Sequence, residues 1–252
     1  MNTNRLTLTC LAICASLIYL ITPARAHDTW ITVDAFQAAE NSVPGYTVVN
    51  SHLFPAPAED VMDPERLEEL FFISPSSRRI SEKGPFTETG TFLAVAIPVN
   101  GFATKNPDGY QRGKNKKEVD DPILCRNSMK FAKAVFTVGT SGGQAYAKPL
   151  GHAMEIIPLK DPATLKTGDI LPVKVLKEGK PARTYVFGTF DGFSKEANTF
   201  AYTTRTDKQG MATIKLIHDG TWLLIAKDEE PYPDTSVCDV QRLAASLTFN
   251  VK

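Results

Sequence analysis

Four histidines, His27, His52, His152 and His218, are the side chains of this sequence best suited to metal chemistry. His27 directly follows Ala-Arg-Ala, a pattern typical of the site at which a signal peptidase cuts. After such a cut, the α-amino nitrogen and the imidazole Nδ1 of His27 can chelate one metal ion together. Nitrogen donors of this kind suit nickel, copper, cobalt and zinc. An exported protein can also begin with histidine by chance, so both interpretations stay open.

The other histidines differ in their surroundings. His52 follows a strand-like run, and His152 precedes another at the start of the second half of the chain, so each could present a ligand from a loop. A structural histidine is the commoner outcome for either one taken alone. Glu155 lies three residues after His152, and could contact a metal or be an ordinary edge carboxylate. His218 is expected in an exposed hairpin turn.

The first 26 residues have the features of a secretory signal peptide. Arg5 supplies the positive start, residues 6–21 are mostly apolar, and the Ala-Arg-Ala sequence follows. The apolar run is short and interrupted by polar residues, which argues against a retained membrane anchor. We therefore expect a periplasmic mature chain that starts at His27 and has no membrane span.

Composition excludes several classes of protein. The 28 basic and 28 acidic residues balance, and 42% of residues are hydrophobic, which is typical of a globular chain and not of a disordered one. Loss of the signal removes two arginines and no acid and leaves a net charge of −2, whereas nucleic-acid binders are normally basic. The mature chain has no nucleophile elbow, phosphate-binding loop, H-E-x-x-H or C-x-x-C motif. We expect a protein that is not an enzyme.

Two of the four cysteines, Cys10 and Cys14, lie in the signal. The remaining two, Cys125 and Cys238, are predicted to form a disulfide, because cysteines in an oxidising compartment usually pair. The alternative is two free thiols. The disulfide would join the middle of the chain to its last segment.

Short strand-like runs separated by Pro and Gly predict a mainly β protein of two sandwich-like domains. The first, residues 27–148, is β-rich, with a solvated polar loop at 105–121 and short helices at 63–70 (Asp63 as N-cap) and from 125 towards 133. The second, residues 149–252, shows regularly spaced strands and turns typical of an immunoglobulin-like sandwich. We expect this second domain to fold alone, with Trp222 in its core.

Several segments of the mature chain resemble the DUF4198 family of exported proteins. They are residues 27–31, 51–55, 130–134, 149–159, 178–181, 206–210 and 220–223, with the closing strand. Their order and spacing agree with the family through nearly the whole mature chain. Ser51 stands where the family often has Gly, and Phe131 where it usually has Tyr, so a hydroxyl is missing at the second position. Some members of the family are associated with nickel or cobalt uptake.

The resemblance implies a periplasmic accessory protein that captures a divalent transition metal and passes it to a membrane importer. Nickel is the first expectation, with cobalt, copper or zinc as alternatives, and His27, His52 and His152 as the ligands. A second hypothesis is a structural or interaction protein with immunoglobulin-like domains and no metal site, because fold alone does not assign function. A third is a copper enzyme in which His27, its amino group and one other histidine hold the metal.

Overall fold

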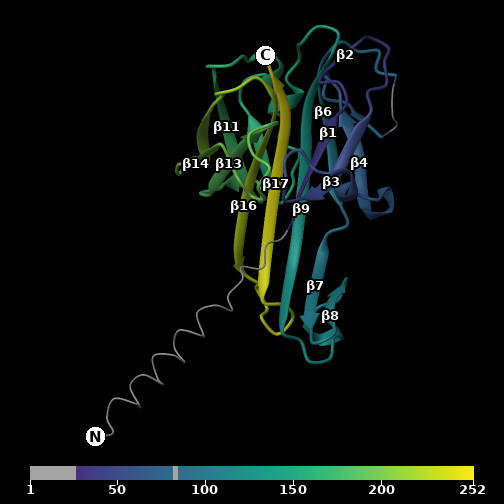
Figure 1. The fold of residues 1–252 in the computed structure, drawn as a ribbon, viewed down its shortest axis with the longest axis vertical. Coiled ribbons are helices and arrows are strands. Elements are labelled where there is room, and N and C mark those ends of the chain that lie inside the picture. Colours follow the sequence, from purple (N-terminus) through teal and green to yellow (C-terminus); the bar gives the residue numbers. More distant parts are fainter. Residues whose placement is uncertain (1–26, 82–84) are drawn as a thin grey trace, which may run out of the picture.

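The computed structural model describes residues 27–81 and 85–252, and the signal peptide expected at residues 1–26 lies outside this part. The chain is mainly β (Figure 1). Only short 3-10 turns interrupt the strands in the described ranges: Ala58–Asp60, Pro64–Arg66, Lys116–Glu118, Ala145–Ala147 and Pro162–Thr164. None of the described helices has the length and apolar character needed to cross a membrane.

One large sheet dominates the molecule, and its strands run in the spatial order β14-β13-β16-β17-β9-β6-β4-β5. Its three longest members, β9, β16 and β17, extend past most of the other strands in Figure 1. The bounds of these strands are Tyr202–Arg205 (β14), Tyr185–Phe190 (β13), Gly220–Pro231 (β16), Val240–Val251 (β17), Leu124–Val138 (β9), Gly90–Pro98 (β6), Leu67–Ile73 (β4) and Arg79–Ile80 (β5). Three strands join it off this path: β2 (Gln37–Ala38) and β7 (Gly101–Asn106), which pair with β9, and β8 (Gly109–Arg112), which pairs with β7.

A smaller sheet covers each face of the large one, so the molecule has three layers. On one face, called here the first face, lie β10 (Met154–Pro158), β11 (Ile170–Lys177), β12 (Lys180–Pro181) and β15 (Met211–Lys215). On the second face lies the ribbon of β1 (Asp28–Val33) and β3 (Tyr46–Ser51). Strand β9 contributes to both cores because its side chains alternate: Phe131 and Val135 face the first, and Ala132 and Ala134 the second.

The strands after β9 confirm the predicted immunoglobulin-like sandwich. Strands β10, β11 and β15 form one layer, and β14, β13, β16 and β17 form the other, with antiparallel pairing throughout. Trp222 of β16 is fully buried between them, as predicted. Its indole nitrogen donates a hydrogen bond of 2.9 Å to the carbonyl oxygen of His218.

The predicted boundary between residues 148 and 149 falls in a loop, but the two sides share one sheet. Strand β17 pairs in parallel with β9 from Val240 beside Arg126 to Thr248 beside Ala134. Phe131 and Val135 of β9 lie in the same hydrophobic core as Trp222. The second half therefore depends on β9 for one edge partner and for part of its core.

Both predicted helices are replaced by other structure. Residues 125–133 belong to β9, because this segment is paired on both sides, by β17 and by β6 and β7. At 63–70, Asp63 caps Glu65 as predicted, with its carboxylate accepting a 2.9 Å hydrogen bond from the backbone N–H. The helix ends after one 3-10 turn, since Leu67 begins β4 and pairs with β6. Pairing within a sheet overrides local helix preference in both places.

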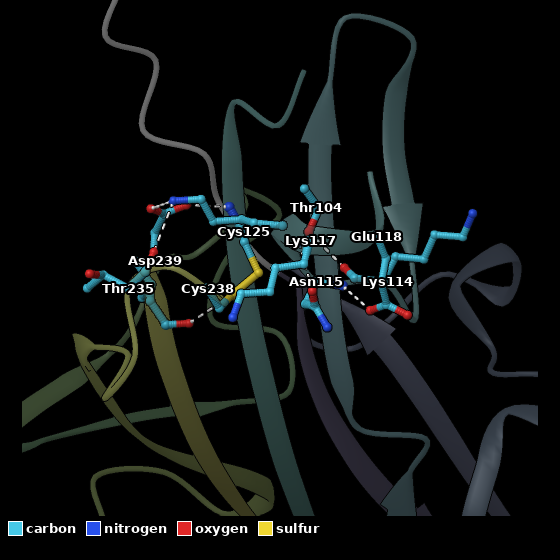
Figure 2. Close-up of a disulfide and its surroundings, with 11 residues drawn as sticks. Thr104, Lys114, Asn115, Lys117, Glu118, Cys125, Thr235, Cys238 and Asp239 are labelled. Carbon is cyan, nitrogen blue, oxygen red and sulfur yellow. Dashed lines mark hydrogen bonds and ion pairs between the residues drawn. A yellow bond between two sulfur atoms is a disulfide. The ribbon is translucent and has the colours of Figure 1, made fainter. Parts of the chain in front are cut away.

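The segment 105–121, expected as a solvated polar loop, has mostly exposed side chains, and its residues 105–112 belong to the hairpin of β7 and β8. Strands β7 and β8 turn at residues 106–109, where the side chain of Asn106 accepts a hydrogen bond from Asp108 N–H. The following turn is closed by a capping box between Asn115 and Glu118 (Figure 2). Lys116, expected on an exposed face, makes a 2.7 Å ion pair with Asp239.

The predicted disulfide between Cys125 and Cys238 is present, with the two Cα atoms 4.9 Å apart (Figure 2). The parallel pair β9 and β17 begins beside it, with Arg126 opposite Val240. The Asp239 carboxylate also accepts a 2.8 Å hydrogen bond from the backbone N–H of Cys125. The disulfide and these contacts fix the register in which the two halves of the chain pair.

Candidate functional site

The first and second of the predicted ligands, His27 and His52, lie together. Strands β1 and β3 are antiparallel with Asp28 opposite Ser51, so the next residues outward, His27 and His52, face each other across the ribbon. Their imidazole rings stack, with centroids 4.1 Å apart and planes inclined by 23°. The pairing of two local strands therefore creates this pair.

The surroundings of His27 favour its neutral imidazole, which is the form that binds metals. Burial lowers the pKa of His27 below its ordinary value of 6.5, and nearby His52 and Lys130 lower it further, while Asp60 and Asp28 oppose them. The Nδ1 atom of His52 is buried and has no hydrogen-bond partner in the described part of the chain. The backbone around His52 is fixed, since its carbonyl oxygen accepts a 2.8 Å hydrogen bond from Asn198 N–H.

Lys130 of β9 projects from the second face towards the same ribbon. Its ammonium group donates a 2.8 Å hydrogen bond to the side-chain oxygen of Asn50 on β3, which also accepts one from Thr29 on β1. Burial lowers the pKa of Lys130 to about 8, against the attraction of Asp28. This lysine is thus a partly desolvated cation next to the histidine pair.

His152 does not join the pair, so the three-histidine ligand set is not assembled. Its ring stacks on Phe131, with centroids 4.8 Å apart, on the first face of the large sheet. Phe131 and Lys130 are neighbours on β9 and point to opposite faces, so the sheet separates His152 from His27. Burial lowers the pKa of His152 to about 4, and its Nδ1 has no partner among the described residues.

Beside His152 lies a buried ion pair that sequence analysis missed. The Nζ atom of Lys133 is 3.2 Å from Glu155 Oε2, and both side chains are only 1% exposed. The Glu155 carboxylate also accepts hydrogen bonds from the backbone N–H groups of Leu150, Gly151 and His152. Burial alone would raise the pKa of Glu155, but Lys133 and these N–H donors bring it below its ordinary value.

This arrangement is structural in character. It ties β9 to the loop before β10, every acceptor of the carboxylate is used, and each group is closed off from solvent. A sequence signal existed, because Lys133 interrupts an otherwise apolar strand between Phe131 and Val135. A charge in that position needs a buried partner.

The histidine pair could supply two imidazole nitrogens, and the α-amino group of His27 would be a third donor in a chain cut before it. Within the described residues, no group of three or more His, Cys, Asp or Glu side chains is arranged around a common metal position. A metal site here therefore depends on the terminal amine or on ligand atoms from outside the chain. His218 lies in the predicted turn, with 51% of its side chain exposed, and stacks on Phe190.

Comparison with known proteins adds limited information. No curated protein sequence matches the chain. Among solved structures, the D0-D1 domain of intimin matches with a probability of 0.99, a TM-score of 0.22 and 17% identity, over 87% of this chain and 96% of that one. A likeness with so low a TM-score carries no argument about function. The sequence model described as "Domain of unknown function (DUF4198)" matches residues 24–230, more than four fifths of the 252-residue chain. The chain belongs to the DUF4198 family.

Proposed function

We propose that this protein binds a divalent transition-metal ion in the periplasm and passes it to an uptake system. The ligands are the imidazoles of His27 and His52 and the α-amino nitrogen of His27 exposed by signal cleavage. Nickel is the leading candidate, and cobalt, copper and zinc are alternatives. We leave out His152, the third ligand expected from the sequence, because its ring packs on the other face of the sheet.

One observation carries the proposal: the stacked rings of His27 and His52, with centroids 4.1 Å apart. Nitrogen ligands lie about 2.0 to 2.1 Å from a zinc ion, so two of them on one ion are about 3 to 4 Å apart. The separation of the ring centroids is close to this distance, and a rotation of one imidazole about its side-chain bonds would let both rings bind the same ion. The buried and unpartnered Nδ1 of His52 and the lowered pKa of His27 support the same assignment.

The ring centroids are only 4.1 Å apart, which suits adjacent ligand positions on one ion after a rotation of one ring, and not opposite ones. A copper enzyme with a T-shaped site needs its two imidazoles on opposite sides of the metal. Accessory metal binding therefore fits this pair better than oxygen activation does. If the protein binds none of the four metals in the titration described next, the conclusion is a structural protein without a metal site.

The test is calorimetric titration with Ni, Co, Cu and Zn of protein that begins at His27, against protein with one additional N-terminal Gly. The extension turns the amine into an amide, which at neutral pH is a poor ligand for any metal that does not displace the amide proton. We expect the extended form to bind at least tenfold more weakly with an unchanged circular dichroism spectrum. His218→Ala is the matched histidine control and should bind normally.

Equal affinity of the two forms would remove the amino group from the site. Normal metal binding by His27→Ala would overturn the proposal that the metal is bound at His27 and His52. A drop in pH should weaken binding, because each ligand must lose its proton before it binds the metal.

A further inference from the structure

A cavity of about 500 Å³ opens beside the histidine pair, and His27 is one of its lining residues. Its walls come from β1, β9, β13, β14, β16 and β17, so segments far apart in the sequence build it. The volume lies within the range of small-molecule sites, roughly 300 to 1,000 Å³. It is much larger than a single metal ion requires.

The charges that line this cavity are unbalanced. Five basic and three acidic side chains face it: Lys130, Arg183, Arg205, Lys227 and Arg242, with Asp28, Asp228 and Glu229. All three acids are engaged by a cation within 3 Å. The pairs are Asp28 with Lys227, Glu229 with Arg242, and Asp228 with Lys177, a lysine that does not line the cavity.

Three basic groups are left without an acidic partner in the described part of the chain: Lys130, Arg183 and Arg205. Lys130 has a neutral amide as its hydrogen-bond acceptor. The guanidinium of Arg205 lies over the ring of Tyr185, 5.4 Å from its centroid. The cavity thus concentrates positive charge that the protein itself does not neutralise.

Two further donors of the lining are buried and unsatisfied. The Nη1 atom of Arg242 and the Nδ2 atom of Asn198 have no hydrogen-bond partner among the described residues. Buried polar groups are normally hydrogen-bonded, so each such atom needs an explanation. The two unsatisfied atoms and the three basic groups without an acidic partner are all hydrogen-bond donors, so a complementary ligand must bring acceptors.

We propose that the cavity binds a small organic anion with two or more carboxylate groups. Carboxylates match the planar guanidinium groups of Arg183 and Arg205 and the ammonium group of Lys130. Tyr185, Phe187 and Ala244 give the cavity an apolar wall for a carbon skeleton. An inorganic phosphate would supply the charge but would leave most of the volume and this wall without contact.

A bound anion would also affect metal binding at His27 and His52. This part of the inference rests on the proposed function. A bare dication near Lys130, Arg183 and Arg205 meets repulsion, whereas a metal–carboxylate complex does not. Because His27 lines the cavity, a carboxylate bound there lies next to the proposed metal position. The substrate class is then a metal ion carried with a polycarboxylate, whose oxygens supply the ligands that the chain lacks.

Calorimetric titration of metal-free protein, residues 27–252, with tricarballylate at low ionic strength tests the anion site separately from the metal. We expect binding, and an at least tenfold loss of affinity in Arg183→Gln/Arg205→Gln. The matched control, Lys208→Gln/Lys215→Gln, removes the same charge from exposed positions outside the cavity and should bind like the parent protein. Inorganic phosphate, titrated in parallel, should bind more weakly.

No binding of tricarballylate at millimolar concentration would overturn the proposal. An equal loss of affinity in the control variant would show that tricarballylate responds only to the overall charge of the protein, which would contradict a specific site. Phosphate binding as tight as tricarballylate binding would show that the site takes an inorganic anion and not an organic one. Failure of the metal site is distinguishable: His52→Ala should lose metal and keep tricarballylate. Arg183→Gln/Arg205→Gln should keep free metal and lose tricarballylate.

Discussion

Each face of the large sheet has histidine and lysine side chains, but they are enclosed and paired on the first face and next to an open cavity on the second. On the first face, His152, Lys133 and Glu155 are enclosed, and the charges satisfy each other. On the second face, His27 and Lys130 adjoin an open cavity with basic groups left unpaired. A buried charge that is fully paired holds a fold together, whereas unpaired groups at a cavity wall are available to a ligand. We therefore propose that the pairing of charges, more than the residue types, distinguishes the structural face from the ligand-binding face.

Strand β9 serves both faces, and its removal should have the largest effect. We expect a chain of residues 149–252 alone to show no cooperative unfolding, because β17 loses its parallel partner and the first-face core loses Phe131 and Val135. Urea denaturation followed by circular dichroism, with residues 27–252 as the control, measures this. A sigmoidal transition in the short chain would show that the second half is an independent domain.

On the first face, Glu155→Leu should lower the free energy of unfolding by about 3 to 5 kcal/mol, the usual cost of leaving a buried charge without its partner. Lys133 would be left unpaired, and three backbone N–H groups would lose their acceptor. Adding Lys133→Met should recover part of the loss in urea denaturation. The exposed pair of Glu69 and Arg79 is the control, since Glu69→Leu should cost no more than about 1 kcal/mol. A double variant less stable than Glu155→Leu would contradict the assignment of Glu155 and Lys133 as partners.

A smaller effect is expected from pH. The folded-state pKa of His152, about 4, lies below its ordinary value of 6.5, so the unfolded chain takes up the proton first as pH falls. Stability from this group is present above pH 6.5 and is lost progressively towards pH 4. Between pH 6.5 and 5, where carboxylates scarcely titrate, the melting temperature of His152→Leu should fall less steeply than that of the parent. Equal slopes would show that His152 is not desolvated in this way.

Local patterns in the sequence were sufficient for much of the fold. Counting the cysteines outside the expected signal predicts the disulfide, and alternation with regular turns predicts the immunoglobulin-like sandwich around Trp222. The parallel pairing of β9 with β17 could not be predicted, because it joins strands more than a hundred residues apart. The same distant pairing places residues 125–133 in β9, where the sequence predicts a helix. The hairpin of β7 and β8, where the sequence predicts a polar loop, is closed by a local turn and joined to the large sheet by the pairing of β7 with β9.

Only the part of the candidate site that depends on the pairing of neighbouring strands could be predicted from the sequence. His27 and His52 flank two strands that form one ribbon, so antiparallel register alone brings them together. Placing His152 required knowing which face of β9 it packs on, and this depends on Phe131 and Lys133 facing away from Lys130. The cavity could not be predicted from the sequence, because Arg183, Arg205 and Arg242 come from three different strands or their flanks.

The most direct test of the difference between the two faces is metal titration of one histidine variant from each. Using correctly processed protein that begins at His27, we expect His52→Ala to bind nickel at least tenfold more weakly. His152→Leu, although it changes a more deeply buried histidine, should bind with the affinity of the parent. If His152→Leu lost affinity for nickel and His52→Ala bound it normally, the metal site would lie on the first face. This result would contradict the roles proposed for the two faces of the sheet.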